Sequence, residues 1–173
     1  MLLALAYSHF LSSSILAAPG GPTSHTLFSF QSASSGKSLE AIRKQVNANL
    51  YGIFNFSKAV LNSMIQRKSG TIINISSLAG KNAFVGGTMY GATKHALMGF
   101  TKSLMLEVRE YNIRVAAICP GSVDTNFNPN REVIPEKKNI LLSEDVAETV
   151  MLVLKMPVRA MVSEIDIRPT NPK

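Results

Sequence analysis

Tyr90, Lys94 and Ser77 are the residues whose types and spacing could carry out a reaction. Tyr90 and Lys94 stand at positions i and i+4, which places both side chains on one face of a helix, about one turn apart. From there an ammonium group can stabilise a phenolate, and so lower the pKa of the phenol from its usual value of about 10. Ser77 lies at the mouth of a predicted strand, close enough to share a substrate oxygen with the phenol. The three side chains outline a proton-transfer site.

A strand and a helix are predicted to position these side chains. The run TIINI at 71–75 is short and β-branched, which is typical of a strand buried on both faces. A helix is predicted over 90–108, and its apolar stripe consists of Leu97, Thr101, Leu104 and Val108. The strand therefore delivers Ser77 at its end, and the helix carries Tyr90 and Lys94 in its first turns.

Strands and helices alternate along the rest of the chain. In chain order the sequence predicts an amphipathic helix over 39–68 capped by Ser38, a strand over 113–119, a helix over 143–155 capped by Ser143, and a strand over 163–168. This alternation predicts an α/β fold with a parallel sheet that binds ligands at the carboxyl ends of its strands. Residues 122–140 are polar and contain prolines, which favours a mobile lid over that edge.

Asn49 and Gly52 interrupt the predicted helix over 39–68. Both residue types are mediocre helix formers, and an asparagine toward the apolar side must find a partner for its amide. On the residues alone, a tolerated polar residue at a bend and a functional asparagine are equal alternatives for Asn49.

Residues 1–37 differ in composition from the rest of the chain. They are apolar and rich in serine, and no lysine or arginine precedes Lys37. We expect a poorly ordered or spurious leader here, with residues 38–173 as the folded domain. Export is the alternative, because the Ala17-Ala18 pair is a weak cleavage signal. Serines and a histidine break the apolar run, so no membrane-spanning helix is predicted.

The composition limits the classes of function. A chain of 173 residues with 46% hydrophobic and 17% charged residues is ordinary for one globular domain. The net charge of +7 is spread over separate basic pairs such as Arg43-Lys44, so no nucleic-acid partner is predicted. The single cysteine, Cys119, allows no intrachain disulfide and no cysteine cluster for a metal, which favours a cytoplasmic protein without a metal site.

Four segments together resemble one known family. They are VNANLYG at 46–52, INISSLAG at 73–80, YGATK at 90–94 and ICPGSVDT at 118–125. Their order, spacing and predicted elements closely resemble the second half of the short-chain dehydrogenase/reductase family. The resemblance implies a partial Rossmann-like, doubly wound parallel sheet. It also implies an NAD(P)-dependent oxidoreductase that transfers a hydride between nicotinamide and a small ketone or secondary alcohol.

The resemblance also implies roles for individual residues. Tyr90 is then the general acid/base, Lys94 lowers its pKa and holds the nicotinamide ribose, Ser77 hydrogen-bonds the substrate carbonyl, and Asn49 anchors a water next to Lys94. The loop that packs against nicotinamide is matched by Pro120, Gly121, Val123 and Thr125. The cofactor is then NAD or NADP, with NADP slightly favoured. A homo-oligomer is expected, with contacts through the helices at 39–68 and 90–108.

The resemblance starts near Ser38. The glycine-rich TGxxxGxG turn and the NNAG segment of the family have no equivalent in residues 1–37. The strand at 71–75 is then expected to have an unpaired edge. An inactive fragment, or an interaction protein derived from the family, is therefore the alternative function. The last strand, IDIRPTNPK, lacks the glycine pair common in acyl-carrier-protein reductases and looks more like the broad-substrate alcohol and hydroxy-acid dehydrogenases.

Overall fold

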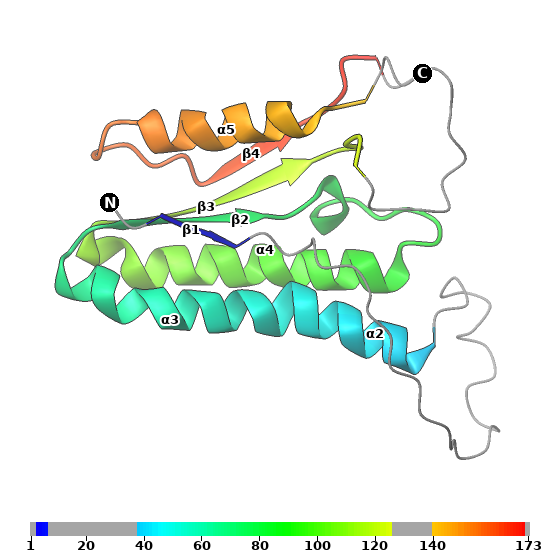
Figure 1. Cartoon of the computed structure of the whole chain (residues 1–173), viewed down its shortest axis with the longest axis horizontal. Helices are drawn as coiled ribbons and strands as arrows, with labels where there is room; N and C mark the ends of the chain where they lie inside the picture. Colours follow the sequence, from blue (N-terminus) through cyan, green and yellow to red (C-terminus); the bar gives the residue numbers. More distant parts are fainter. Residues whose placement is uncertain (1–2, 7–37, 126–139, 172–173) are drawn as a thin grey trace.

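A four-stranded parallel sheet forms the centre of the molecule (Figure 1). The computed structural model describes residues 3–6, 38–125 and 140–171. Its strands are β1 (Leu3–Ala6), β2 (Gly70–Ile75), β3 (Ile113–Pro120) and β4 (Glu164–Ile167), and they lie side by side in the order β1-β2-β3-β4. Every neighbouring pair is parallel. The predicted α/β fold with a parallel sheet is confirmed.

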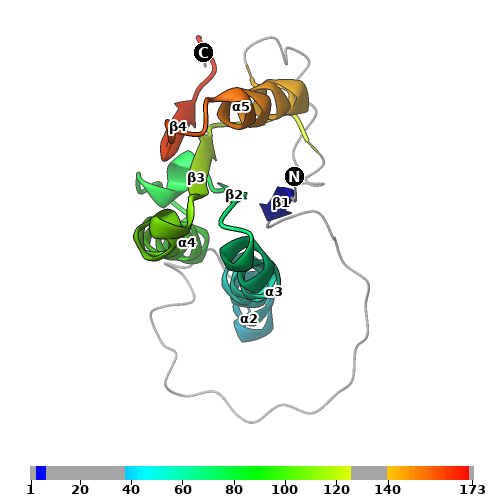
Figure 2. The same cartoon turned by 90° about the vertical axis from the view of Figure 1, so that its left-hand side faces the viewer.

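Helices cover both faces of this sheet (Figure 2). Helices α3 (Gly52–Gln66) and α4 (Thr88–Val108) lie on one face, and α5 (Ser143–Lys155) lies on the other. Successive residues of β2 point to opposite faces, so Ile73 packs in the core beneath α5 while Ile72 packs with the residues of α3 and α4. The prediction of a strand buried on both faces is therefore confirmed, as is the buried stripe of α4.

The helical run that begins at Leu39 contains a turn of π-helix. It consists of α2 (Leu39–Val46), a π-helical turn (Asn47–Tyr51) and α3. Ser38 caps it as predicted, because its side-chain oxygen accepts a hydrogen bond from the amide of Ala41 at 3.2 Å. The predicted single regular helix is wrong at its centre, where the wider turn holds Asn49 buried. Single π-helical turns of this kind are frequent at functional sites.

Strand β1 occupies the edge of β2 that was expected to be unpaired. Leu3 to Ala6 pair in parallel with Thr71 to Asn74. The expectation of an exposed edge on β2 is therefore wrong, because backbone hydrogen bonds of the sheet are satisfied there by the first residues of the chain. Residues 7–37, which make up most of the predicted leader, lie outside the described part of the chain.

The start of α5 differs from the predicted cap. Ser143 is the first helical residue, and its hydroxyl donates to the carboxylate of Glu144 at 3.1 Å. The carboxylate of Asp145 instead accepts from the amide of Leu142 at 2.7 Å. An acidic side chain in the first turn can satisfy a backbone donor at a helix start as well as a serine can, which the sequence alone does not distinguish.

Within the described residues, no helix has both the length and the apolar character needed to cross a bilayer. Three or more histidine, cysteine, aspartate or glutamate side chains do not come together there in a group that could hold a metal ion.

Candidate active site

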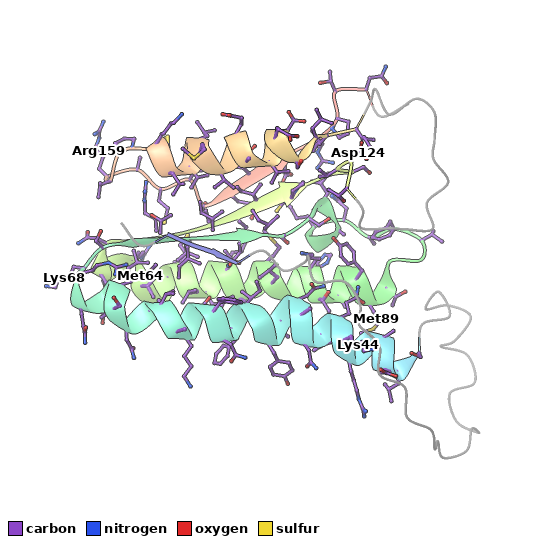
Figure 3. All side chains as sticks on the ribbon, in the orientation of Figure 1. Lys44, Met64, Lys68, Met89, Asp124 and Arg159 are labelled. Atoms are coloured by element: carbon purple, nitrogen blue, oxygen red, sulfur yellow. The ribbon has the colours of Figure 1, made fainter. Side chains whose placement is uncertain are left out.

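The predicted site residues gather at the carboxyl edge of the sheet. Strand β2 ends at Ile75 and β3 ends at Pro120, while α4 begins at Thr88 and runs back from this edge. In Figure 3, Met89 and Asp124 lie toward this end of the molecule, and Lys68 and Arg159 lie at the opposite end. The parallel topology thus brings the end of β2, the start of α4 and the loop after β3 to one place, as expected for a ligand site of an open α/β sheet.

Ser77 and Tyr90 are in direct contact. Their side chains lie close enough for the serine hydroxyl to lower the pKa of the phenol. Ser77 has an extended backbone and caps a short 3₁₀ turn (Leu78–Gly80), where its side-chain oxygen also accepts from the amide of Ala79 at 3.1 Å. The neighbouring Ser76 is buried at 5% exposure, whereas Ser77 is half-buried. Ser77, and not the buried Ser76, therefore lies next to the phenol.

Lys94 lies beneath Tyr90 in the interior. Its side chain is 4% exposed, its Nζ donates to the carbonyl of Ile75 at 3.2 Å, and the same atom is 5.8 Å from the centroid of the Tyr90 ring. The ammonium therefore faces the ring of Tyr90. Burial disfavours the charged form and lowers the pKa of Lys94 to about 8, although the nearby Cys119 acts in the opposite direction.

The pKa of Tyr90 shifts in the direction opposite to the one expected. Burial raises the pKa of this phenol, and the hydrogen bond with Ser77 lowers it by less. The i,i+4 argument assumed an ammonium that acts on an exposed phenol, but here the phenol is itself partly desolvated. Desolvation destabilises the phenolate and exceeds the effect of the hydrogen bond.

Asn49 reaches the site through a residue that the sequence did not single out. Its Nδ2 donates to the hydroxyl of Thr93 at 3.1 Å, and that hydroxyl donates to the backbone carbonyl of Tyr90 at 2.9 Å. Asn49 and Thr93 are each 4% exposed. The sequence feature that could have identified Thr93 is its position one residue before Lys94, on the side of α4 that faces the π-helical turn. The chain Asn49–Thr93–Tyr90 fixes the first turns of α4 against the π-helical turn.

Thr93→Val is expected to destabilise the fold by about 1–3 kcal/mol, because it keeps the shape of the side chain but leaves the buried amide of Asn49 without its acceptor. Urea unfolding followed by circular dichroism measures this change. The matched control is Thr149→Val in α5, since Thr149 donates the same kind of bond to the carbonyl of Asp145 within its own helix. Equal effects of the two substitutions would contradict a special role for Thr93.

Gly80 allows the Ser77 turn to lie directly on α4. A Cβ at this position would come within 2.9 Å of the carbonyl oxygen of Lys94 and of the Ser76 hydroxyl, and 3.0 Å from Met98. Because a backbone atom and a packed core restrict any adjustment, only glycine fits without displacing the turn from the helix.

Gly80→Ala is therefore expected to destabilise the protein by roughly 1–3 kcal/mol and to move Ser77 away from Tyr90. Gly99→Ala in α4 is the control, because nothing lies within 4 Å of the Cβ it would add. There, alanine is expected to stabilise the helix by about 0.5–1 kcal/mol. Thermal unfolding of both variants measures the contrast, and a neutral Gly80→Ala would show that the turn can move at little cost.

The loop after β3 lies at the same edge. The amide of Gly121 donates to the carbonyl of Ile167 at 2.9 Å, and Val123 forms an isolated bridge with Leu141. Pro120 is buried at the end of β3, and Thr125 is half-buried at the last residue of this described stretch. The predicted cofactor-binding residues are thus held at the edge by β4 and by Leu141. The lid predicted over 122–140 lies mostly outside the described residues.

Two further residues border the site without having been predicted. Lys81, which follows the Ser77 turn, forms ion pairs with Glu164 and with Asp166 at 2.8 Å, and so ties this turn to β4. The ring of Phe84 packs edge-on against Tyr90, with centroids 6.4 Å apart. Neither contact could be found from sequence spacing, because each joins segments whose distance depends on the tertiary fold.

Comparisons of the sequence with known proteins identify its family. A family model described as short chain dehydrogenase matches residues 28–133. Carbonyl reductase family member 4 of Xenopus tropicalis is 38% identical over 123 residues, which cover 68% of this chain and 52% of that protein. The chain thus spans about half the length of the curated relatives it matches.

Solved structures resemble the fold as well. A closed form of serine dehydrogenase complexed with NADP⁺ is similar with a TM-score of 0.70 and 30% identity, over 77% of this chain and 57% of that one. An alcohol dehydrogenase from Thermococcus sibiricus complexed with 5-hydroxy-NADP is similar with a TM-score of 0.69 and 27% identity, over 78% and 56% of the two chains. Because the family model matches more than half of the sequence, the chain belongs to the short-chain dehydrogenase family and is an oxidoreductase by ancestry.

Proposed function

We propose that this chain catalyses NAD(P)-dependent hydride transfer between nicotinamide and a ketone or secondary alcohol, with Tyr90 as general acid/base. The observation that carries the proposal is the proximity of Ser77 to Tyr90 at the carboxyl edge of the sheet, with Lys94 buried beneath and its Nζ 5.8 Å from the centroid of the Tyr90 ring. Two hydroxyl groups in contact can both donate to one substrate oxygen, which polarises a carbonyl toward attack.

The residues of this edge fit the nicotinamide half of the cofactor. Tyr90 and Lys94 supply donors suited to ribose hydroxyls, and Thr125 supplies a hydroxyl for the amide group. A Cβ on Gly121 would lie 3.3 Å from Leu78 and from Pro169, so glycine keeps the loop close to the sheet. A bound reduced nicotinamide would supply the hydride for the carbonyl carbon. NADP is the favoured form, in line with the NADP complexes of similar structures.

The protonation of Tyr90 favours reduction of a carbonyl. Because burial raises the pKa of the phenol, Tyr90 keeps its proton at neutral pH and can give it to the oxygen of a ketone. The phenolate that remains is stabilised by the hydrogen bond from Ser77 and by the ammonium of Lys94. Asn49 is proposed to hold a water from which the proton is replaced.

The test is turnover by the purified chain. NADPH oxidation is followed at 340 nm with a panel of ketones, and NADPH binding is measured separately by its fluorescence. Ketone-dependent oxidation that disappears in Tyr90→Phe supports the proposal. A chain that binds no nicotinamide cofactor and reduces no ketone would overturn it.

A protein of this family that acts by association is the second candidate. Three aromatic side chains on α3 and the preceding turn are more than half exposed, namely Tyr51, Phe54 and Phe56. These exposed rings favour an interaction surface on this helix. The same helices are the proposed contacts of a homo-oligomer. Light scattering that shows oligomers, combined with an absence of NADPH binding, would favour this candidate over the enzyme.

A further inference from the structure

Phe84 and Val85 form an exposed apolar pair beside the catalytic tyrosine. Phe84 is 54% exposed and Val85 is fully exposed. Both belong to the loop that joins the Ser77 turn to α4, and the ring of Phe84 meets the ring of Tyr90 at an interplanar angle of 72°. Large apolar side chains next to a reactive group are a common wall of a small-molecule site.

The backbone holds this pair in place. The amide of Gly87 donates to the carbonyl of Phe84 at 3.1 Å, and Gly86 has a φ of +80°. These features match a type II turn, in which the third position favours glycine and the second, here Val85, projects into solvent. The Phe84 ring lies directly on Gly87, where a Cβ would approach it within 2.2 Å. The ring thus packs against Gly87 and Tyr90, while about half of the residue stays exposed to solvent.

The charges around this loop restrict what it can bind. The segment from Asn82 to Thr93 contains no acidic or basic residue. The nearest cation along the chain, Lys81, is engaged by Glu164 and Asp166, and Lys94 is buried beneath Tyr90. A substrate with a carboxylate would find no exposed cation on this loop, whereas an apolar substituent would cover the rings of Phe84 and the side chain of Val85.

We propose that Phe84, supported by Val85, is the specificity-determining wall of the site, and that it selects ketones with an aryl or bulky alkyl group over oxo acids. This inference rests on the proposed function, from which the position of the substrate carbonyl is taken. With the ketone oxygen accepting from Tyr90 and Ser77, one substituent lies within reach of the Phe84 ring. Aromatic contact of this kind changes affinity by roughly tenfold.

The test uses acetophenone as the probe, with acetone and pyruvate for comparison. Binding to the purified chain is measured by saturation-transfer NMR, which needs no turnover, and kcat/KM with NADPH is measured alongside. Acetophenone is expected to bind, and Phe84→Ala is expected to weaken its binding roughly tenfold while leaving acetone unchanged. Leu152→Ala is the control, because Leu152 is 55% exposed and lies on α5, on the opposite face of the sheet.

The outcomes separate this inference from the proposed function. If acetophenone binds through Phe84 but the chain binds no NADPH and reduces no ketone of the panel, the role of Phe84 in binding stands and the enzymatic proposal fails. Acetophenone binding that is equal in the parent and in Phe84→Ala would overturn the inference, as would stronger binding of pyruvate than of acetophenone. Ketone reduction with no preference for acetophenone over acetone would overturn it as well, while leaving the oxidoreductase proposal intact.

Discussion

Tyr90→Phe is expected to lower kcat for NADPH-dependent ketone reduction by about 10²–10⁴-fold or more, because it removes the proposed proton donor. The ring remains, so its packing against Phe84 is retained, and NADPH binding should weaken only by the loss of one proposed hydrogen bond to the ribose. Steady-state kinetics give kcat and KM, and fluorescence titration gives the affinity for NADPH. The loss in kcat is expected to be much larger than the loss in NADPH affinity.

Tyr51→Phe is the control for this substitution. Tyr51 is 59% exposed at the end of the π-helical turn and makes no part of the proposed site, so its kinetic constants should match those of the parent. A Tyr90→Phe protein that keeps parental kcat would show that another group, such as Ser77 or a water, supplies the proton. The dependence of kcat on pH provides a second check. Because the pKa of Tyr90 is raised above its ordinary value of 10, Tyr90 should remain protonated, and the rate of reduction should be maintained, up to that pH.

Lys94→Met is expected to stabilise the fold at pH 7 by about 2 kcal/mol while abolishing activity. The difference between the ordinary pKa of 10.5 and the value of about 8 in the folded chain corresponds to a cost of about 3 kcal/mol for the buried ammonium. Methionine removes that cost and fills the space, but it forfeits the hydrogen bond to the carbonyl of Ile75, worth about 1 kcal/mol. Such a trade of stability for function is common at active sites.

The pH dependence of the stability difference between the parent and Lys94→Met tests whether the buried ammonium causes it. As the pH rises from about 8 to 10.5, Lys94 loses its proton in the folded state while the unfolded chain still holds it, so the parent gains stability and the advantage of Lys94→Met shrinks. Urea unfolding of both proteins at pH 7 and at pH 9.5 measures the difference. Lys102→Met in the same helix is the control, because its side chain is 65% exposed and its ion pair with Glu164 contributes little. A destabilised Lys94→Met at pH 7 would contradict the prediction.

Local patterns in the sequence were sufficient to predict most of the secondary structure. Two such patterns are the β-branched run before Ser77 and the three- and four-residue spacing of the apolar stripe in α4. Both are visible within a short stretch of sequence, and both elements form as expected. The end of the helix before β2 shows the limit of such patterns. Helix α3 stops at Gln66, two residues earlier than predicted, and Lys68 adopts a left-handed conformation with a φ of 50°.

Other features depend on contacts between distant segments. The pairing of β1 with β2 joins the first residues of the chain to residues 71–74, and no local signal marked Leu3 to Ala6 as a strand. The π-helical turn holds Asn49 where it bonds Thr93 on another helix, a contact that propensities within 39–68 do not contain.

The sequence by itself determined which groups are available for chemistry: the family motifs, the order of strands and helices, and the candidates Asn49, Ser77, Tyr90 and Lys94. The tertiary structure alone decided how these groups behave. It buried Tyr90 enough to raise the pKa of the phenol, buried Lys94 enough to lower its pKa, and placed Phe84 against the ring of Tyr90. The reason is physical, since spacing along a helix fixes which side chains are neighbours, whereas desolvation depends on everything that packs around them.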